Sequence, residues 1–317
     1  MPSPPPLPRI ALAGAGAATA LGLGALGWSL LEAKAYTVRQ VRVPVLPPTA
    51  PEIRVLHLSD LHLLPRQRHT IAWLRALGEL EPDLVINTGD NMAHRRAMPT
   101  VLHALEPLLE RPGAFVMGSN DYYAPQMKNP ARYLLRDARR TDAEGPPPED
   151  LPGRELGRAF AAAGWRDLTN RRDTLSVRGV PFALVGVDDP HLDRDRFPAA
   201  DGGASGGDAV VRLGVAHAPY QRVLNAMHAD GCGMIFAGHT HGGQLCVPGY
   251  GALVTNCDLD TGRASGLSEW PGAAGEPGSA WLHVSNGIGT SPFTPVRLAC
   301  RPSVTLLTLT RRTDPNA

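Results

Sequence analysis

Three short apolar runs, each ending in polar residues, place the tightest limit on what this chain can fold into. They are residues 53–58 (IRVLHL, before SD), 83–87 (DLVIN, before TGD) and 114–117 (AFVM, before GSND). Between them, apolar residues recur at helical spacing over 68–80 and 101–109. This strand–helix–strand–helix–strand order predicts an α/β sheet, in which ligands bind at the carboxyl ends of the strands.

The second half of the chain is expected to be rich in strands, with one clear helix at 220–229. An edge strand over 41–45, ended by a Pro-Pro pair, precedes the first apolar run. Three loops rich in glycine or proline, at 143–153, 201–207 and 272–279, are predicted to be flexible. The expected later strands are 174–177, 182–187, 210–216, 234–237, 244–247, 281–284 and 303–309.

The N-terminal segment contains one long uncharged stretch, unlike the short apolar runs described above. Residues 10–31 contain no charged side chain, and a helix of that length extends about 33 Å, enough to cross the hydrocarbon of a bilayer. The segment predicts an uncleaved membrane anchor, with a cleaved export signal as the alternative. Arg9 flanks it on one side and Lys34, Arg39 and Arg42 on the other, so the positive-inside rule leaves the sidedness of the domain open.

Charge and cysteine usage narrow the functional class. The formal net charge is +1 with histidines neutral, so the chain has no basic field with which to hold nucleic acid non-specifically. The four cysteines form no CxxC pair, which excludes a zinc ribbon or a thioredoxin motif. Two disulfides in an exported domain and four buried free thiols are both compatible with the spacing.

Acids, imidazoles and one amide gather at the ends of the predicted strands. Imidazole combined with carboxylate suits Mn, Fe, Zn or Co, and one aspartate can bridge two such cations about 3.5–4 Å apart. Because side chains two apart on an extended segment point the same way, each DxH or HxH pair is expected to face one site. The candidate ligands are Asp60, His62, Asp90, Asn120, His217, His239 and His241.

In this order, the motifs DLH, GD, a modified GN motif, an isolated histidine and GHTH resemble the calcineurin-like metallophosphoesterase superfamily. The membrane-associated bacterial members are the most similar, and the resemblance covers about residues 54–309. It implies an α/β fold, a four-layer α-β-β-α sandwich preceded by an N-terminal hydrophobic helix. The expected divisions are an anchor or signal at 1–35, a linker with an edge strand at 36–52, and a catalytic domain at 53–312.

The resemblance also implies a site with two divalent metal ions. Asp60, His62 and His241 would hold the first metal, Asn120, His217 and His239 the second, and Asp90 would bridge both. A hydroxide between the metals would hydrolyse a phosphate ester. A phosphodiester or a lipid- or nucleotide-linked phosphate is the favoured substrate. The alternatives are a phosphomonoesterase with the same site, and a catalytically slow metal-bound protein that binds lipid or an envelope partner.

One motif departs from the family pattern. The family has Gly-Asn-His followed by an acid, and this chain reads GSND at 118–121. Asn120 is preferred to Ser119 as the ligand because an amide oxygen ligates better than a hydroxyl. The histidine that contacts the phosphate is absent, and Asp121 and His94 are the candidate catalytic replacements.

We interpret two further sets of residues as structural. His57 lies within the first strand and alternates with the motif residues, so we interpret it as structural. The run Asp-Asp-Pro-His at 188–191 is interpreted as a turn with capping aspartates, and whether it borders the site is left open.

Overall fold

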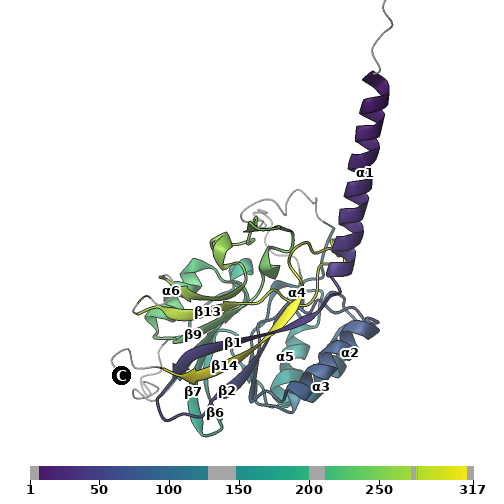
Figure 1. Cartoon of the computed structure of the whole chain (residues 1–317). Coiled ribbons are helices and arrows are strands. Elements are labelled where there is room, and N and C mark those ends of the chain that lie inside the picture. The colour runs from purple at the N-terminus through teal and green to yellow at the C-terminus, as the bar shows by residue number, and fades with distance from the viewer. Residues whose placement is uncertain (1–6, 128–147, 200–210, 273–275, 277, 313–317) are drawn as a thin grey trace, which may run out of the picture.

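The computed structural model describes residues 7–127, 148–199, 211–272, 276 and 278–312 (Figure 1). The side chains of residues 7–18 and of residue 21 also lie outside the description. The three loops predicted to be flexible fall wholly or partly outside the described residues. The rest of the chain forms two mixed sheets with helices, so the predicted α/β class is confirmed.

The first sheet contains the three apolar runs. Its strand order is β1-β14-β2-β3-β4-β5, in which β2 to β5 are parallel and β14 is antiparallel to β2. β1 lies at the edge of the sheet and is parallel to β14. The strands are β1 (Thr37–Leu46), β2 (Ile53–Leu58), β3 (Leu84–Asn87), β4 (Gly113–Phe115), β5 (Arg166–Asp167) and β14 (Ser303–Arg311).

The second sheet has the order β12-β13-β9-β8-β7-β6. Its four inner strands are parallel, and β6 and β12 are antiparallel edges. The strands are β6 (Arg171–Val177), β7 (Val180–Gly186), β8 (Val211–Val215), β9 (Met234–Ala237), β12 (Gly266–Trp270) and β13 (Ala280–Val284). The inner strands are runs of buried Val, Leu and Ile because both faces of the sheet are covered.

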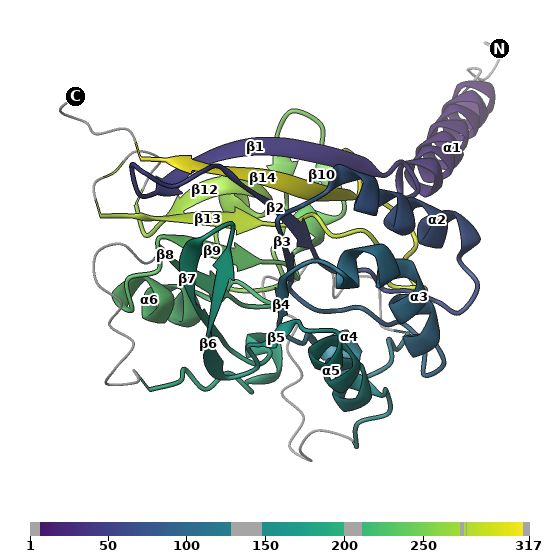
Figure 2. The same cartoon turned by 90° about the horizontal axis from the view of Figure 1, so that it is seen from below.

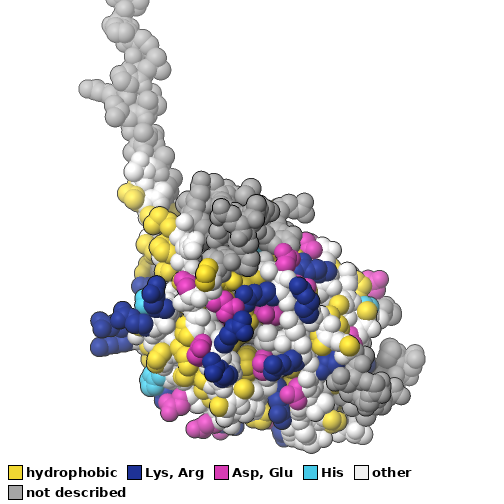
Figure 3. All heavy atoms as spheres, turned by 180° about the vertical axis from the view of Figure 1, so that it is seen from behind, with side chains coloured by type: hydrophobic (Ala, Val, Ile, Leu, Met, Phe, Trp, Pro, Cys, Tyr) yellow, Lys and Arg dark blue, Asp and Glu magenta, His cyan; other side chains and the backbone are white. Residues whose placement is uncertain are grey.

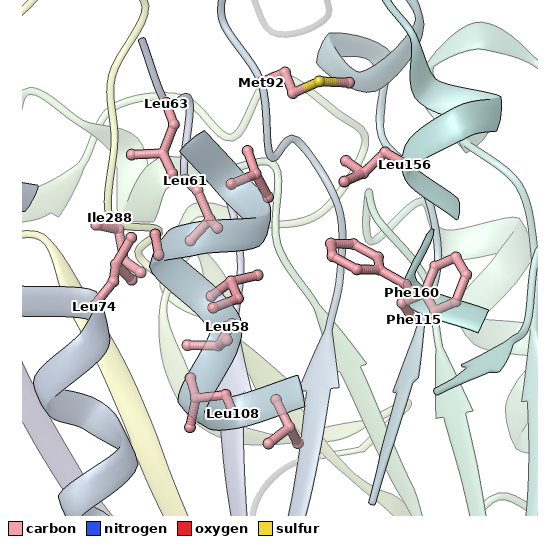
Figure 4. Close-up of a cluster of buried hydrophobic side chains, with 14 of the residues drawn as sticks. Leu58, Leu61, Leu63, Leu74, Met92, Leu108, Phe115, Leu156, Phe160 and Ile288 are labelled. Carbon is pink, nitrogen blue, oxygen red and sulfur yellow. The ribbon is translucent and has the colours of Figure 1, made fainter. Parts of the chain in front are cut away.

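Three buried clusters show how the layers pack. One cluster lies between the sheets and joins Val55 and Ile86 to Leu213 and Phe236. A second packs three helices on the outer face of the first sheet (Figure 4), and a third packs one helix on the second sheet (Figure 2). These helices are α2 (Arg68–Ala76), α3 (Met98–Leu109) and α5 (Gly153–Ala162), and α6 (Gln221–Ala229).

The structure differs from the predicted elements in three places. The helix α5 was missed because it carries two glycines and buries only a narrow apolar stripe. The edge strand β12 was missed because its pattern does not alternate. The strand predicted over 244–247 shrinks to β10 (Cys246–Val247), paired with β11 (Gly251–Ala252), because a 3-10 turn, η4 (His241–Gly243), and a left-handed Gln244 precede it.

The N-terminal helix α1 (Leu7–Glu32) projects from the body of the protein (Figure 1). In the part of the chain that the structure describes, no helix is both long and apolar enough to cross a membrane. Much of the stretch at 10–31, predicted as an anchor, has side chains outside the described residues. The end of α1 contacts the body directly, since Ser29 O accepts a hydrogen bond from the Arg297 N–H at 3.0 Å.

Glu32 fastens the last turn of α1 to the loop that precedes β14. Its carboxylate is buried and accepts hydrogen bonds from the N–H groups of Ala299 (3.1 Å) and Cys300 (2.7 Å), and from Trp28 Nε1 (3.0 Å). We expect Glu32→Ala to lower the free energy of unfolding by about 2–4 kcal/mol, because buried donors lose their acceptor. Chemical denaturation of the full chain measures this. Glu32→Gln, which keeps one acceptor, should lose less; equal stability of Glu32→Ala and the unchanged chain would contradict the role of Glu32.

Candidate metal site

The candidate ligands come from both sheets and meet at the carboxyl ends of their strands. Two follow β2, one follows β3, one lies in the short helix α4 (Ser119–Tyr122) after β4, one follows β8 and two follow β9. Parallel strands present their carboxyl ends at one edge, and the face-to-face packing of the sheets brings the two edges together. These residues are Asp60, His62, Asp90, Asn120, His217, His239 and His241.

Two overlapping groups of side chains have donor atoms within 4.8 Å of one another: Asp60, His62 and His241, and Asp60, Asp90 and His217. Asp60 is common to both groups, and Asp90 belongs to the second group but also approaches His62 of the first. One Asp90 oxygen is 3.5 Å from His62 Nε2, and the other is 3.5 Å from His217 Nε2. A carboxylate with one oxygen toward each group has the arrangement that a bridging ligand needs.

The backbone at these positions is not extended, contrary to the argument from alternation. Asp60, His62, Asp90, His239 and His241 all have φ between 42° and 67°, in the left-handed region. Residues other than glycine rarely adopt this conformation, and such strain gathers at functional sites. The turns direct His241 toward His62 while the ring of His239 lies against that of His217, with ring centroids 5.2 Å apart. His241 therefore belongs to the first group, whereas His239 belongs to neither group and lies against His217 of the second, so the pair does not face one site.

The buried donor atoms fit a cation. His62 Nε2 and His241 Nε2 lie 3.1 Å apart with stacked rings. Asp60 Oδ1 and His217 Nε2 are buried and have no hydrogen-bond partner. Burying lone pairs without a donor costs free energy, and a divalent cation would satisfy several of them at once. The set of imidazole and carboxylate donors suits Mn, Fe, Zn or Co.

Backbone carbonyls orient two of the histidines. His217 Nδ1 lies 2.8 Å from Thr88 O, and His239 Nε2 lies 3.2 Å from Asn256 O. Because a carbonyl only accepts, each of these nitrogens carries the proton. When the ring is neutral, this tautomer leaves the lone pair on the opposite nitrogen, His217 Nε2 and His239 Nδ1, where a metal can be bound.

Closely spaced charges shift the pKa values of the site. Burial alone would lower the pKa of His217, but the carboxylates of Asp90, Asp189 and Asp60 outweigh it and raise the pKa to about 9. Burial would raise the pKa of Asp90, yet His217, His62 and the hydrogen bonds from Asn120 hold it well below its usual range. Burial raises the pKa of Asp60. The site thus concentrates negative charge around imidazoles.

Metal binding is expected to be coupled to proton release at His217. With a pKa of about 9, its Nε2 is protonated at neutral pH and must lose the proton before it can ligate. Affinity should therefore rise with pH up to about 9, and binding at neutral pH should release about one proton from this residue. Calorimetry in buffers of different ionisation enthalpy measures the number. His217→Gln should abolish the proton release that comes from this residue. If the heat of metal binding to the unchanged chain did not depend on the buffer, the prediction would be wrong.

The residues of the GSND segment differ in their contacts with Asp90. The Asn120 side chain lies against Asp90, with Nδ2 2.8 Å from Oδ2, and its N–H donates to Oδ1 at 2.7 Å. The amide of Asn120, rather than the Ser119 hydroxyl, is thus positioned beside the proposed bridge. Gly118 allows this approach, because a Cβ there would collide with Asp90 and His217.

Asp121 and His94 lie outside the cluster of donor atoms. The Asp121 carboxylate is fully buried and accepts hydrogen bonds from the N–H groups of Asp90 (2.9 Å), Asn91 (2.9 Å) and Gly118 (3.0 Å). It therefore holds the backbone of two ligand loops. His94 Nδ1 accepts from the Arg96 N–H at 3.1 Å, on a surface hollow formed with residues 64–67.

Residues outside the predicted set also border the site. The His191 ring lies 4.5 Å from that of His239. Asp189 is buried and caps the turn, accepting from the His191 N–H at 2.8 Å, so the predicted capping turn is confirmed and lies beside the site. The DDPH run was the available signal. His57, interpreted as structural, is buried and contacts His283 and Thr88 rather than the donor cluster.

Arg297 was missed because no motif surrounds it. Its buried guanidinium donates to the carbonyls of Asn286 and Gly289, both at 2.8 Å, and lies 3.2 Å from His241 Nδ1. It supports the loop behind His241 from a position 56 residues further along the chain.

All four cysteines are free and buried.

Comparison with known proteins agrees with this geometry. The calcineurin-like phosphoesterase family model matches residues 53–243. A protein of Escherichia coli K12 named phosphodiesterase YaeI is 27% identical over 82% of this chain and 83% of its own length. An uncharacterized metallophosphoesterase of Aquifex aeolicus is 27% identical over 88% of this chain and 92% of its own length.

Proposed function

This chain belongs to the calcineurin-like phosphoesterase family, and we propose that it hydrolyses phosphate esters at a site that holds two divalent metal ions. The observation that carries the proposal is the pair of overlapping donor groups, with the two Asp90 oxygens each 3.5 Å from an imidazole Nε2. The attacking group would be water, because bound metal ions lower its pKa and no protein nucleophile is then required.

Separate sets of residues would hold the two metal ions. Asp60, His62 and His241 would hold one metal, Asn120, His217 and His239 the other, and Asp90 both. Bound divalent ions lower the pKa of water and neutralise charge on a phosphate. The protein supplies the orientation, through the carbonyls of Thr88 and Asn256 and through the Asp121 carboxylate. These contacts pre-organise the donors, so little reorganisation is needed when substrate binds.

A phosphodiester is the favoured substrate. Its support is the likeness to a relative whose name is phosphodiesterase. The charge-free stretch at 10–31 supports a location at a membrane, where a lipid-linked phosphate would meet the site. One observation favours a slow metal-bound binding protein as the second candidate: the chain lacks the motif histidine, and the Asp121 carboxylate is bound by backbone N–H groups.

One experiment separates these functions. The full chain is stripped of metal, reloaded separately with Mn, Fe, Zn or Mg, and assayed on an aryl phosphodiester and an aryl phosphomonoester. Metal-dependent diester hydrolysis is the expected result. Monoester hydrolysis alone would replace the diesterase with a phosphatase. Bound metal without turnover would favour the binding protein, and absence of bound metal would refute the site.

A further inference from the structure

The exposed apolar side chains of this protein are not scattered. Among the side chains that the structure describes, every large hydrophobic residue with high exposure except Met127 belongs to one of three segments. These segments are the described part of α1, the hairpin at 245–253 and the loop at 290–296. The exposed residues are Leu23, Leu26, Trp28, Leu30, Leu31, Leu245, Val247, Tyr250, Leu253 and Phe293.

Hydrogen bonds join the three segments into one surface, which we call the apolar collar. The Cys246 N–H donates to Leu298 O at 2.8 Å, and the Gln244 side chain donates to Thr294 O at 3.0 Å. The Arg297 N–H in turn donates to Ser29 O in α1. The hairpin, the loop and the helix therefore lie side by side, although hundreds of residues separate the helix from the other two.

The exposed side chains of the apolar collar are uncharged, since Glu32 of α1 is buried, and cations lie next to them. Residues 242–257 and 284–296 contain no Asp, Glu, Lys or Arg. At the base of α1, Lys34 is exposed, and Arg301 Nε donates to Ala35 O at 3.0 Å. Arg68 opens α2, whose His69 ring stacks on Tyr36 at 5.6 Å. Within the described residues, none of these three cations is paired with a carboxylate.

Figure 3, a view from behind, shows hydrophobic side chains where α1 joins the body, with Lys and Arg side chains below them among Asp and Glu side chains. Apolar groups that enter the acyl boundary, with cations at headgroup level, are the pattern of a surface that binds an anionic bilayer. An exposed apolar surface of this kind marks an interaction site.

We propose that the apolar collar docks the domain itself onto an anionic lipid bilayer, in addition to any anchoring by residues 10–31. Tyr250 and Phe293 enter the interface, while Lys34, Arg68 and Arg301 meet the headgroups. The bilayer is favoured over a protein partner because the cations border the apolar residues near the base of α1, whose residues 10–31 carry no charge. Because β10 begins five residues after His241, docking places the metal site beside the lipid surface.

Site-specific fluorescence tests the proposal. The native cysteines are buried, so Tyr250→Cys and Phe293→Cys can each be labelled with an environment-sensitive dye in the full chain. Ser176→Cys, an exposed position on β6, is the matched control. Vesicles are mostly phosphatidylcholine with a minor share of phosphatidylglycerol. Labels at 250 and 293 should shift to the blue and be quenched by nitroxide-bearing lipid, whereas the label at 176 is quenched by aqueous iodide alone.

The other outcomes overturn the proposal. Labels at 250 and 293 that behave like the label at 176 exclude docking. Labels shielded from iodide but insensitive to nitroxide lipid indicate a second copy or a protein partner instead of a bilayer. Hydrogen–deuterium exchange of the unsubstituted chain repeats the test without a label, since vesicles should protect 245–253 and 290–296. Neither readout depends on turnover, so the result is independent of the proposed phosphoesterase activity.

Discussion

Asp90→Asn is expected to reduce metal-dependent hydrolysis by about a thousandfold or more and to lower the metal content per chain. The Asp90 oxygens face one imidazole in each donor group, so the substitution removes the charge shared by both groups. The size of the side chain is kept, and one carboxylate oxygen is replaced by an amide nitrogen that cannot accept a hydrogen bond. Metal analysis together with steady-state kinetics on the reloaded chain measures both effects.

A matched control separates the loss of the bridge from a general loss of acidic charge. Asp193→Asn changes an acid with 69% of its side chain exposed, which is paired with Arg222, and should leave metal content and turnover unchanged. The tertiary fold of Asp90→Asn should be retained, as judged by circular dichroism. Wild-type metal content and rate in Asp90→Asn would show that Asp90 is not a ligand.

Asp121→Ala is expected to act on stability. The substitution leaves the buried N–H groups of Asp90, Asn91 and Gly118 without their acceptor. Each unsatisfied buried donor costs about 1–3 kcal/mol, so we expect a loss of about 3 kcal/mol or more in the free energy of unfolding. For a chain of this size, that corresponds to a fall in Tm of roughly 5–10 °C. Thermal and chemical denaturation of the metal-free chain measure the change.

The same variant tests the role that the sequence suggested for Asp121. A residue that only serves the chemistry would leave the metal-free stability unchanged and reduce turnover alone. A residue that holds the loops reduces stability first, and Asp121→Asn, which keeps one acceptor oxygen, should recover part of it. If both variants kept their stability but lost turnover, Asp121 would have a catalytic role.

The strand-end motifs allowed most of the candidate site to be predicted from the sequence. Asp60, Asp90 and His217 each follow a short apolar run, and the carboxyl ends of parallel strands share an edge whatever the intervening loops do. That rule depends only on local pattern and chain direction. It placed the residues together even though the argument from extended backbone was wrong, because the left-handed turns at Asp60 and His62 still direct both side chains into the same group.

The secondary structure could likewise be predicted only where the local sequence pattern is strong. Helices with a wide apolar face, such as α3, could be read from their spacing. The narrow stripe of α5 and the irregular edge strand β12 could not, because their burial comes from the neighbours they pack against and not from their own periodicity.

The sequence by itself therefore determined the α/β class and a set of candidate ligands, five of which the structure brings together in the two donor groups. Only the tertiary structure decided which residues support those donors. Asp90 and Asn91 lie about 30 residues from Asp121, Arg297 reaches His241 across 56 residues, and Glu32 reaches Cys300 across 268. Such contacts join segments whose spacing along the chain carries no periodic signal. The same holds for the apolar collar, whose three segments become one surface only when the sheets and the helix are packed.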